Sequence, residues 1–259
     1  MIKKKIKKIL DKKNKTKIVC LTSYSGNTAS ILDKHCDIIL VGDSMANVLY
    51  GMTNTHTMTL EQMISHSISV KKKIKYSLLV VDMPKNTYLN AKDAKKNAKL
   101  ILKKTGCDAV KIESNKKNYN IIKNLVSINI PVMGHIGFTP QHKKKFKVEG
   151  KSLSQKKKLI KEAHEIQRAG AFSIVLECVS EKTAEQVTNS LKIPTIGIGS
   201  SKKCDGQILV TDDLLGLSGF YPKFVRRYAK LNKIIDKAVK KYSKDVKLGK
   251  FPKTSNSFK

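Results

Sequence analysis

No stretch of this 259-residue sequence approaches the roughly 18 consecutive apolar residues that a membrane-spanning helix requires. The first residues, MIKKKIKKILDKKNK, are basic like the start of a secretory signal, but no apolar core of about seven or more residues follows them. The chain also lacks a long polar tract and a Pro-rich or Ser-rich linker. We therefore expect a cytoplasmic protein with a substantial core and no membrane partner.

Paired cysteines are missing as well. The five cysteines are odd in number and lie far apart, without the CxxC spacing of a zinc site or a redox pair. This usage indicates a reducing compartment and small core side chains. Cys178 directly follows Glu177, but neighbouring residues of a strand point to opposite faces, so we do not expect Cys178 to be a nucleophile.

Acidic residues are scarce, because 20 Asp and Glu oppose 52 Lys and Arg and leave a formal net charge of +32. Such an excess is typical of proteins that bind nucleic acid. However, arginine, whose planar guanidinium suits bases and phosphates, occurs only at Arg168, Arg226 and Arg227. The lysines are spread along the chain on expected outer helix faces. A solvated surface is therefore the preferred interpretation, and a basic nucleic-acid-binding barrel is the alternative.

The sequence does contain a regular alternation of strand and helix patterns. Apolar runs typical of buried parallel strands, separated by helical periodicity, occur at 17–24, 37–44, 77–84, 109–114, 131–137, 173–179 and 194–200, with a weaker one at 207–216. They predict an α/β fold, a single (β/α)8 barrel over residues 1–259 with a short basic N-terminal helix and a basic C-terminal tail. A doubly wound open sheet, which usually has fewer strands, is the alternative.

Acidic residues stand at or near the ends of four of these runs, at Asp43, Asp82, Glu113 and Glu177. In a (β/α)8 barrel the chemistry lies at the carboxyl ends of the strands. Asp43, Asp82 and Glu113 come from successive units, and Glu177 lies further round the rim. Hard carboxylate oxygens are the ligands that Mg2+ prefers, so the pattern predicts a magnesium-assisted enzyme.

Strand alternation predicts which neighbours share the inner face with these acids. Lys111 lies two residues before Glu113 and is expected on the same face. In the second strand, Ile39 and Val41 are expected on the inner face with Asp43. An unpaired buried charge is costly, so the lysine and glutamate together indicate that a metal or substrate completes the neutralisation. A structural ion pair in the barrel floor is the alternative.

Several longer motifs are more specific. They are VGDSMANVLYG, VVDMP, GCDAVKIES, VMGHIGFTPQ, LECV, IPTIGIGS, CDGQILVTDDLLGLSG and YPKFVRRY. In order and spacing, from about Ile9 to the C-terminus, they resemble the ketopantoate (3-methyl-2-oxobutanoate) hydroxymethyltransferase family. The resemblance implies a (β/α)8 enzyme of pantothenate synthesis, the route to coenzyme A. Through a Mg-stabilised enolate, it would convert 3-methyl-2-oxobutanoate and 5,10-methylenetetrahydrofolate to 2-dehydropantoate and tetrahydrofolate.

The same resemblance implies a role for individual residues. Those that resemble the ligands of one Mg2+ per subunit are Asp43, Asp82 and Glu113. Those that resemble the contacts to the keto acid are Asp43, Ser44, Asp82 and Lys111. Glu177 resembles the proton acceptor, and His135 is expected to line the same pocket. The family also implies a homo-oligomer, commonly a decamer. The scarcity of arginine leads us to expect no specific nucleic-acid partner.

Some positions depart from the family pattern. Ser25 and Gly26 stand where an acidic and an aromatic residue are common, the loop 142–152 is shorter and more basic, and Ser201 replaces a frequent glycine. None of these changes removes a residue of the expected metal or acid–base set, so we expect them to affect folate affinity, loop closure and turnover. A related Mg-dependent 2-oxo acid lyase or mutase barrel is the alternative, and it would not depend on folate.

Overall fold

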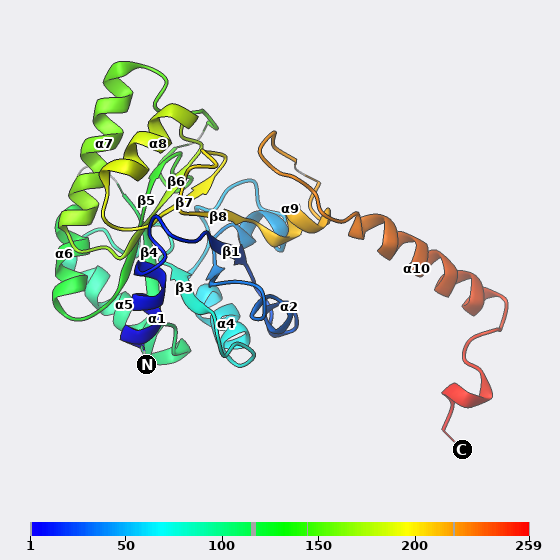
Figure 1. The fold of residues 1–259 in the computed structure, drawn as a ribbon. Helices are drawn as coiled ribbons and strands as arrows, with labels where there is room; N and C mark the ends of the chain where they lie inside the picture. Colours follow the sequence, from blue (N-terminus) through cyan, green and yellow to red (C-terminus); the bar gives the residue numbers. More distant parts are fainter. Residues whose placement is uncertain (1, 115–117, 144, 220, 259) are drawn as a thin grey trace. The chain divides into compact units, whose positions relative to one another are not determined.

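The computed structural model describes residues 2–114, 118–143, 145–219 and 221–258. It divides into two compact units, Met1–Val210 and Thr211–Lys259. In the first unit, eight parallel strands close into a barrel in the order of the sequence (Figure 1). The strands are β1 (Ile18–Thr22), β2 (Ile38–Val41), β3 (Leu78–Asp82), β4 (Ala109–Glu113), β5 (Val132–Gly137), β6 (Ser173–Glu177), β7 (Thr195–Ile198) and β8 (Gly206–Leu209). The predicted barrel is confirmed, including its weak eighth strand, and the open-sheet alternative is wrong.

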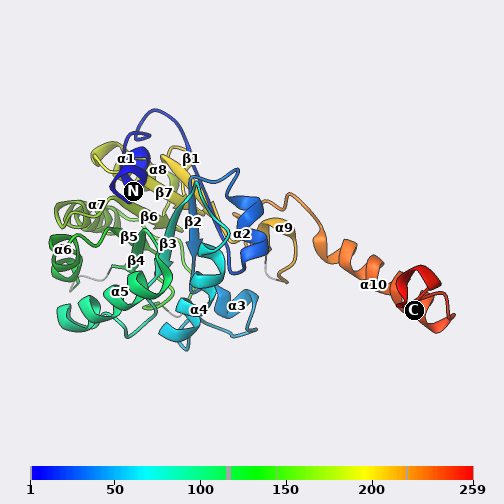
Figure 2. The same ribbon diagram turned by 90° about the horizontal axis from the view of Figure 1, so that it is seen from below.

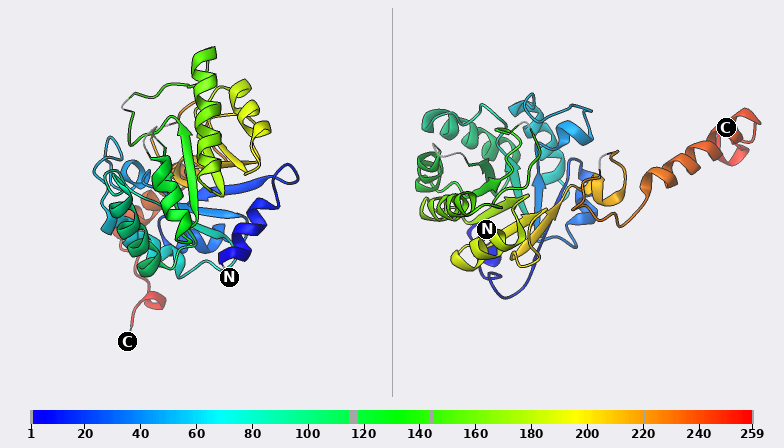
Figure 3. Two further views of the ribbon diagram at one scale, coloured as in Figure 1. Left: turned by 90° about the vertical axis from the view of Figure 1, so that its left-hand side faces the viewer. Right: turned by 90° about the horizontal axis from the view of Figure 1, so that it is seen from above.

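Helices alternate with the strands in the first unit. They are α2 (Gly26–Leu32), α3 (Met45–Val48), α4 (Leu60–Lys71), α5 (Ala91–Thr105), α6 (Tyr119–Ser127), α7 (Leu153–Arg168) and α8 (Glu181–Ser190). Views from below and from above show α4 to α8 outside the strands (Figure 2; Figure 3). Local chemistry sets their ends: α5 begins after the capping side chain of Asn90 and ends at Gly106, which is left-handed. In the part of the chain described, no helix is long and apolar enough to cross a membrane.

Alternating side chains of the strands form two apolar clusters, one inside the barrel and one between the strands and the helices. The expectation for β4 is confirmed, because Val110 and Ile112 belong to the outer cluster. The expectation for Ile39 and Val41 is wrong, since both also belong to the outer cluster and other residues of β2 point inward. The reason is that β2 ends at Val41 and Asp43 lies in the following turn, where strand alternation no longer applies.

A short basic helix, α1 (Ile2–Leu10), packs against the amino end of the barrel. Its Ile9 joins the inner apolar cluster. Lys5 Nζ donates to the carbonyl of Ser77 at 2.7 Å. Just beyond the helix, Lys13 Nζ pairs with Asp205 at 2.8 Å. Some lysines of the N-terminal segment therefore anchor it to the barrel, in addition to the many that face solvent.

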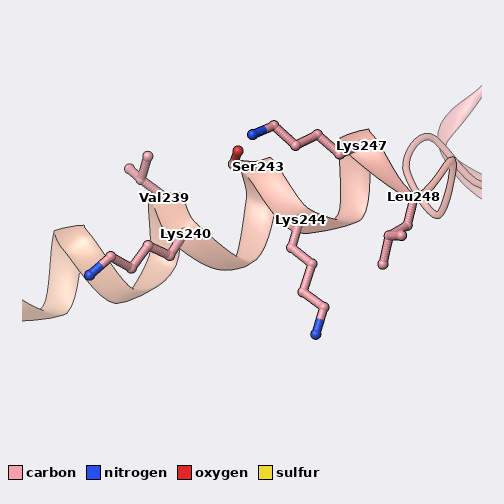
Figure 4. Close-up of a pocket in the computed structure, with 6 residues that line it drawn as sticks. All are labelled: Val239, Lys240, Ser243, Lys244, Lys247 and Leu248. Carbon is pink, nitrogen blue, oxygen red and sulfur yellow. The ribbon is translucent and has the colours of Figure 1, made fainter.

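The second unit contains α9 (Thr211–Leu215), α10 (Leu231–Lys247) and a short 3-10 turn, η1 (Thr254–Asn256). No described residue of α10 is buried. A pocket on this helix is lined by Val239, Lys240, Ser243, Lys244, Lys247 and Leu248 (Figure 4). The lining contains no carboxylate, so this pocket is not the predicted acidic site. That residues 1–259 form one domain stays a prediction.

Candidate active site

The expected site residues meet at the carboxyl end of the barrel because the parallel register aligns the ends of neighbouring strands. Asp82, the last residue of β3, is paired with Lys111 of β4. Glu113, the last residue of β4, is paired with His135 of β5. Glu177 ends β6. Four consecutive strands, β3 to β6, thus contribute polar side chains to one ring at this end of the barrel.

The pair of Lys111 and Asp82 forms the centre of this ring. Lys111 Nζ donates to Asp82 Oδ1 at 2.6 Å, and the two side chains are 7% and 3% exposed. Asp82 Oδ2 accepts from the backbone N–H of Asp43 at 3.1 Å. Burial by itself would lower the pKa of Lys111, but the surrounding carboxylates, Asp82 first among them, outweigh burial and raise that pKa above its usual value. Lys111 therefore stays cationic.

The remaining acids hold protons more tightly than usual. Burial, assisted by the charge of Asp82, raises the pKa of Asp43 to about 7. Burial and then the charge of Asp43 raise the pKa of Glu113 well above its usual value. Burial raises the pKa of Glu177 to about 8, although Lys111 opposes the shift. Four carboxylates face one ammonium here, so three negative charges are uncompensated when all the groups are ionised.

His135 lies between two of the acids. Its Nδ1 is 3.7 Å from Glu113 Oε1 and its Nε2 is 3.3 Å from Glu177 Oε2. Neither contact has hydrogen-bond geometry, so both ring nitrogens are without a hydrogen bond among the described residues. Burial and then the charge of Lys111 lower the pKa of His135 well below its usual value, which makes the imidazole neutral. A buried polar group without a partner indicates that a ligand atom completes the site.

Ser44, expected to contact the keto acid, lies beside this ring at the start of α3. Its hydroxyl hydrogen-bonds to the hydroxyl of Tyr24 at 2.9 Å. Tyr24 is itself buried, and its carbonyl accepts a hydrogen bond from His66 Nδ1 at 2.7 Å. Neither residue was predicted: Tyr24 ends the first apolar run at 17–24 but is not an acid, and His66 lies within α4.

Gln141 is a further site residue that was not predicted from the sequence, and it makes more contacts to the acids than Tyr24 or His66. Its side-chain Nε2 donates to Asp43 Oδ2 at 2.8 Å and to the carbonyl of Met83 at 3.0 Å. Its backbone N–H donates to Glu113 Oε2 at 3.0 Å. Gln141 lies in a turn, so no periodicity marks it, and its place in the motif GHIGFTPQ directly after β5 was the available signal.

The departures at Ser25 and Gly26 have a local structural reason. The side chain of Ser25 caps α2 by accepting from the N–H of Thr28. The N–H of Gly26 donates to Ser69 Oγ of α4 at 3.0 Å. A Cβ at Gly26 would lie 2.9 Å from the carbonyl oxygen of Ser69, so a larger residue would force α2 and α4 apart.

Hydrogen bonds and an ion pair also fix the described part of the loop after β5, which the sequence predicted to be short and basic. Lys143 Nζ donates to the carbonyl of Gly137 at 2.6 Å and to Glu149 Oε1 at 2.8 Å. Lys144 of the same loop lies outside the described residues. Ser201 is buried, and its hydroxyl accepts from a backbone N–H two residues later at 3.1 Å. The described residues of these segments thus make hydrogen bonds that hold the local backbone in place.

The chemistry of the acids fits a hard divalent cation. Within the described residues, no three or more His, Cys, Asp or Glu side chains are already arranged as a metal cage. Both oxygens of Asp82 are engaged, and Glu113 accepts from Gln141. Mg2+ usually binds through one or two carboxylates together with waters and substrate oxygens, so it does not require such a cage. The uncompensated negative charge and the all-oxygen donor set are what such an ion needs.

Comparison with known proteins agrees with this geometry. A sequence profile of the ketopantoate hydroxymethyltransferase family matches residues 3–254. The chain is 51% identical over 255 residues to the 3-methyl-2-oxobutanoate hydroxymethyltransferase of Pelagibacter ubique (strain HTCC1062), with 98% of this chain and 99% of that protein covered. It is 48% identical over 244 residues to the enzyme of the same name from Anaplasma marginale (strain St. Maries), with 93% and 88% covered.

A solved structure of 2,3-dimethylmalate lyase, a member of the PEP mutase/isocitrate lyase superfamily, aligns with a TM-score of 0.65. It covers 96% of this chain and 89% of the lyase chain at 15% identity. This likeness shows the barrel fold alone, so the lyase or mutase alternative has no support beyond the fold. The family profile and the relatives near 50% identity extend over almost the whole sequence. The chain belongs to the ketopantoate hydroxymethyltransferase family.

Proposed function

We propose that the chain converts 3-methyl-2-oxobutanoate and 5,10-methylenetetrahydrofolate to 2-dehydropantoate and tetrahydrofolate, with Mg2+ as its cofactor. Family membership establishes hydroxymethyl transfer to a small molecule from a methylene donor. The choice of folate and of Mg2+, and the residue roles, are the finer parts of the proposal. One observation carries it: the buried carboxylates with one ammonium converge on a neutral, unpaired His135 at the mouth of the barrel.

Binding of the keto acid is assigned to the residues around this ammonium. Lys111 remains cationic and attracts the substrate carboxylate. The neutral ring of His135 has one N–H that can donate to a substrate oxygen, which would satisfy a group that the chain leaves unpaired. Ser44 offers a hydroxyl, and Asp43 and Asp82 line the same end of the barrel. The substrate is held where its C3 can approach a base.

The residues that would hold Mg2+ are Asp43, Asp82 and Glu113. When bound, the ion supplies Lewis-acid polarisation of the keto group, which acidifies the neighbouring C–H bond. The side chains of Asp82 and Glu113 are 3% and 2% exposed, so their oxygens are screened from bulk water. In such surroundings a fixed charge acts more strongly than it does in solvent.

Glu177 is the proposed base. Its side chain is 17% exposed, compared with 2% for Glu113, so it lies nearer the opening through which substrate enters. A pKa of about 8 is close to working pH, which suits a group that must both accept and release a proton. Glu177 takes the proton from C3 of the keto acid. The enolate carbon then bonds to the methylene carbon, whose two C–N bonds to the folate break. Water supplies the hydroxyl group of the product, and the two folate nitrogens take up one proton from C3 and one from water, which leaves tetrahydrofolate.

Proton exchange tests this proposal directly. The C3 proton of 3-methyl-2-oxobutanoate is followed by NMR in deuterated water with Mg2+, then with a chelator, and finally with methylenetetrahydrofolate. Metal-dependent exchange followed by a 2-dehydropantoate signal is the expected result. Exchange without product would refute folate as the donor for this chain while supporting the metal and base roles. No exchange with Mg2+ would overturn the assignment of the site.

The assembly and the compartment of the protein complete the proposal. We propose a homo-oligomer, a decamer with one Mg2+ per subunit, in the cytoplasm. The oligomer is proposed only from what resemblance to this family implies. The five cysteines are all free and buried, which supports a reducing compartment. Light scattering that gives a mass other than that of ten 29.0 kDa chains would refute the decamer.

A further inference from the structure

Gln141 joins parts of the barrel mouth that are far apart in sequence. Its side chain reaches Asp43, 98 residues away in the turn after β2, and Met83, 58 residues away after β3. Its backbone N–H reaches Glu113, 28 residues away, at the end of β4. The side chain is 1% exposed, so water does not compete for these bonds. One residue from the loop after β5 thus touches two of the carboxylates assigned to the metal.

The hydrogen bonds of the Gln141 amide are complete in one orientation. Its NH2 group has two protons, which go to the Asp43 carboxylate and to the Met83 carbonyl, and both of these partners are acceptors. Its Oε1 accepts from the hydroxyl of Tyr88. The flipped amide would turn its oxygen toward the two acceptors, which repels. The network therefore determines the orientation that is seen.

Tyr88 is suited to keep this orientation. It is 5% exposed, and a phenol keeps its proton at neutral pH. The hydroxyl therefore remains a donor, and its proton satisfies Oε1 of Gln141. Removing that donor leaves a buried amide oxygen unpaired and makes the observed orientation of Gln141 less favourable.

We propose that Gln141 is a positioning residue that holds Asp43 for divalent-metal binding, and that Tyr88 acts on the Asp43 carboxylate through the Gln141 amide. This inference rests on the proposed metal role of Asp43. It concerns the side chain of Gln141, because the backbone bond to Glu113 survives substitution. Partners that orient metal-binding carboxylates typically change metal affinity by roughly 10- to 100-fold when they are removed.

The experiment measures Mn2+ dissociation constants by electron paramagnetic resonance of the free ion, without substrates, for the full-length wild type, Gln141→Met, Tyr88→Phe and the double variant. Methionine keeps the length of glutamine but cannot make its hydrogen bonds. Gln141→Met should raise the dissociation constant about tenfold, and Tyr88→Phe should raise it by a smaller factor. The double variant should match Gln141→Met, because Tyr88 has nothing further to orient. Exposed positions supply matched controls: Gln186→Met and Tyr76→Phe should leave the constant unchanged.

The outcomes separate this inference from the proposed function. If wild type and Asp43→Asn bind Mn2+ equally or not at all, the metal site itself is wrong and both proposals fall. If wild type binds and Asp43→Asn does not, but folded Gln141→Met matches wild type, only the role of Gln141 is refuted. Should Gln141→Met fail to fold, Tyr88→Phe decides alone, and an unchanged constant refutes the inference. If Tyr88→Phe lowers Mn2+ affinity by the same factor in wild type and in Gln141→Met, Tyr88 does not act through Gln141.

A second readout distinguishes positioning from general destabilisation. At saturating Mn2+, the rate of C3 proton exchange by Gln141→Met should return to within about threefold of wild type. The substitution lowers the affinity for the metal but leaves the proton-exchange step unchanged once the metal is bound. A variant that is merely destabilised would instead lose exchange in proportion to its unfolded fraction at every Mn2+ concentration. That result would refute the positioning role.

Discussion

Replacing Lys111 with methionine should weaken the metal-free barrel and strengthen its affinity for divalent cations at the same time. Lys111 is 6% exposed and pairs with Asp82 at 2.6 Å. Breaking a buried pair by removing one partner typically destabilises a protein by about 3–5 kcal/mol, because the other charge stays buried and unpaired. The same loss of positive charge leaves four carboxylates unopposed, so a cation should bind more tightly while the keto acid binds more weakly.

The destabilisation should depend on pH. The pKa of Asp43 is raised to about 7 and that of Glu177 to about 8, so below these values the folded site carries protons and less negative charge. Folded acids with raised pKa values bind more protons than the unfolded chain, so the free energy of unfolding falls as pH rises through the folded values. The loss caused by Lys111→Met should therefore be larger at pH 8.5 than at pH 5.5.

Urea denaturation in the presence of a chelator, followed by circular dichroism at both pH values, measures this loss, and Mn2+ titration measures the affinity. Lys158→Met is the matched control. Lys158 is 54% exposed and lies 3.9 Å from Glu162 on α7, so its removal should change stability by about 0.5 kcal/mol or less. A loss for Lys111→Met as small as that of the control, or equal losses at both pH values, would refute the reasoning.

Other substitutions separate the remaining roles. Asp82→Asn should weaken Mn2+ and keto-acid binding together in calorimetry, and a selective loss of only one would contradict a shared site. Glu177→Gln should keep the keto-acid dissociation constant within about threefold and reduce turnover by about 10²- to 10⁴-fold, so near-normal turnover would mean that another group is the base. Metal-free wild type should lose stability as pH rises through about 8, because folded Glu177 keeps its proton to higher pH than the unfolded chain does. Glu177→Gln should flatten that slope in urea melts, and an unchanged slope would exclude Glu177 as its source. Gly134→Ala would place a Cβ 2.5 Å from Ile166 Cγ2 and should lose about 1–3 kcal/mol, and combining it with Ile166→Ala should lose less than the two changes separately.

Much of the barrel was predictable because its information is local. Each strand is a short apolar run between helical patterns, and even the eighth, weakest run at 207–216 begins with residues of β8, although its later residues form α9. The inward position of Lys111 followed from its spacing to Glu113, since both lie within β4. Spacing failed for Ile39 and Val41 because it was counted from Asp43, which lies beyond the end of β2.

The sequence by itself determined the family, the number and order of the strands, and the acids at their ends, because motifs and periodicity are properties of neighbouring residues. Only the tertiary structure decided what surrounds those acids. Barrel closure brings Gln141 to Asp43 across 98 residues, and it leaves His135 buried without a hydrogen bond among the described residues. The raised pKa values of Asp43 and Glu177 have the same origin, because burial and the distances between charges exist only after the chain has folded.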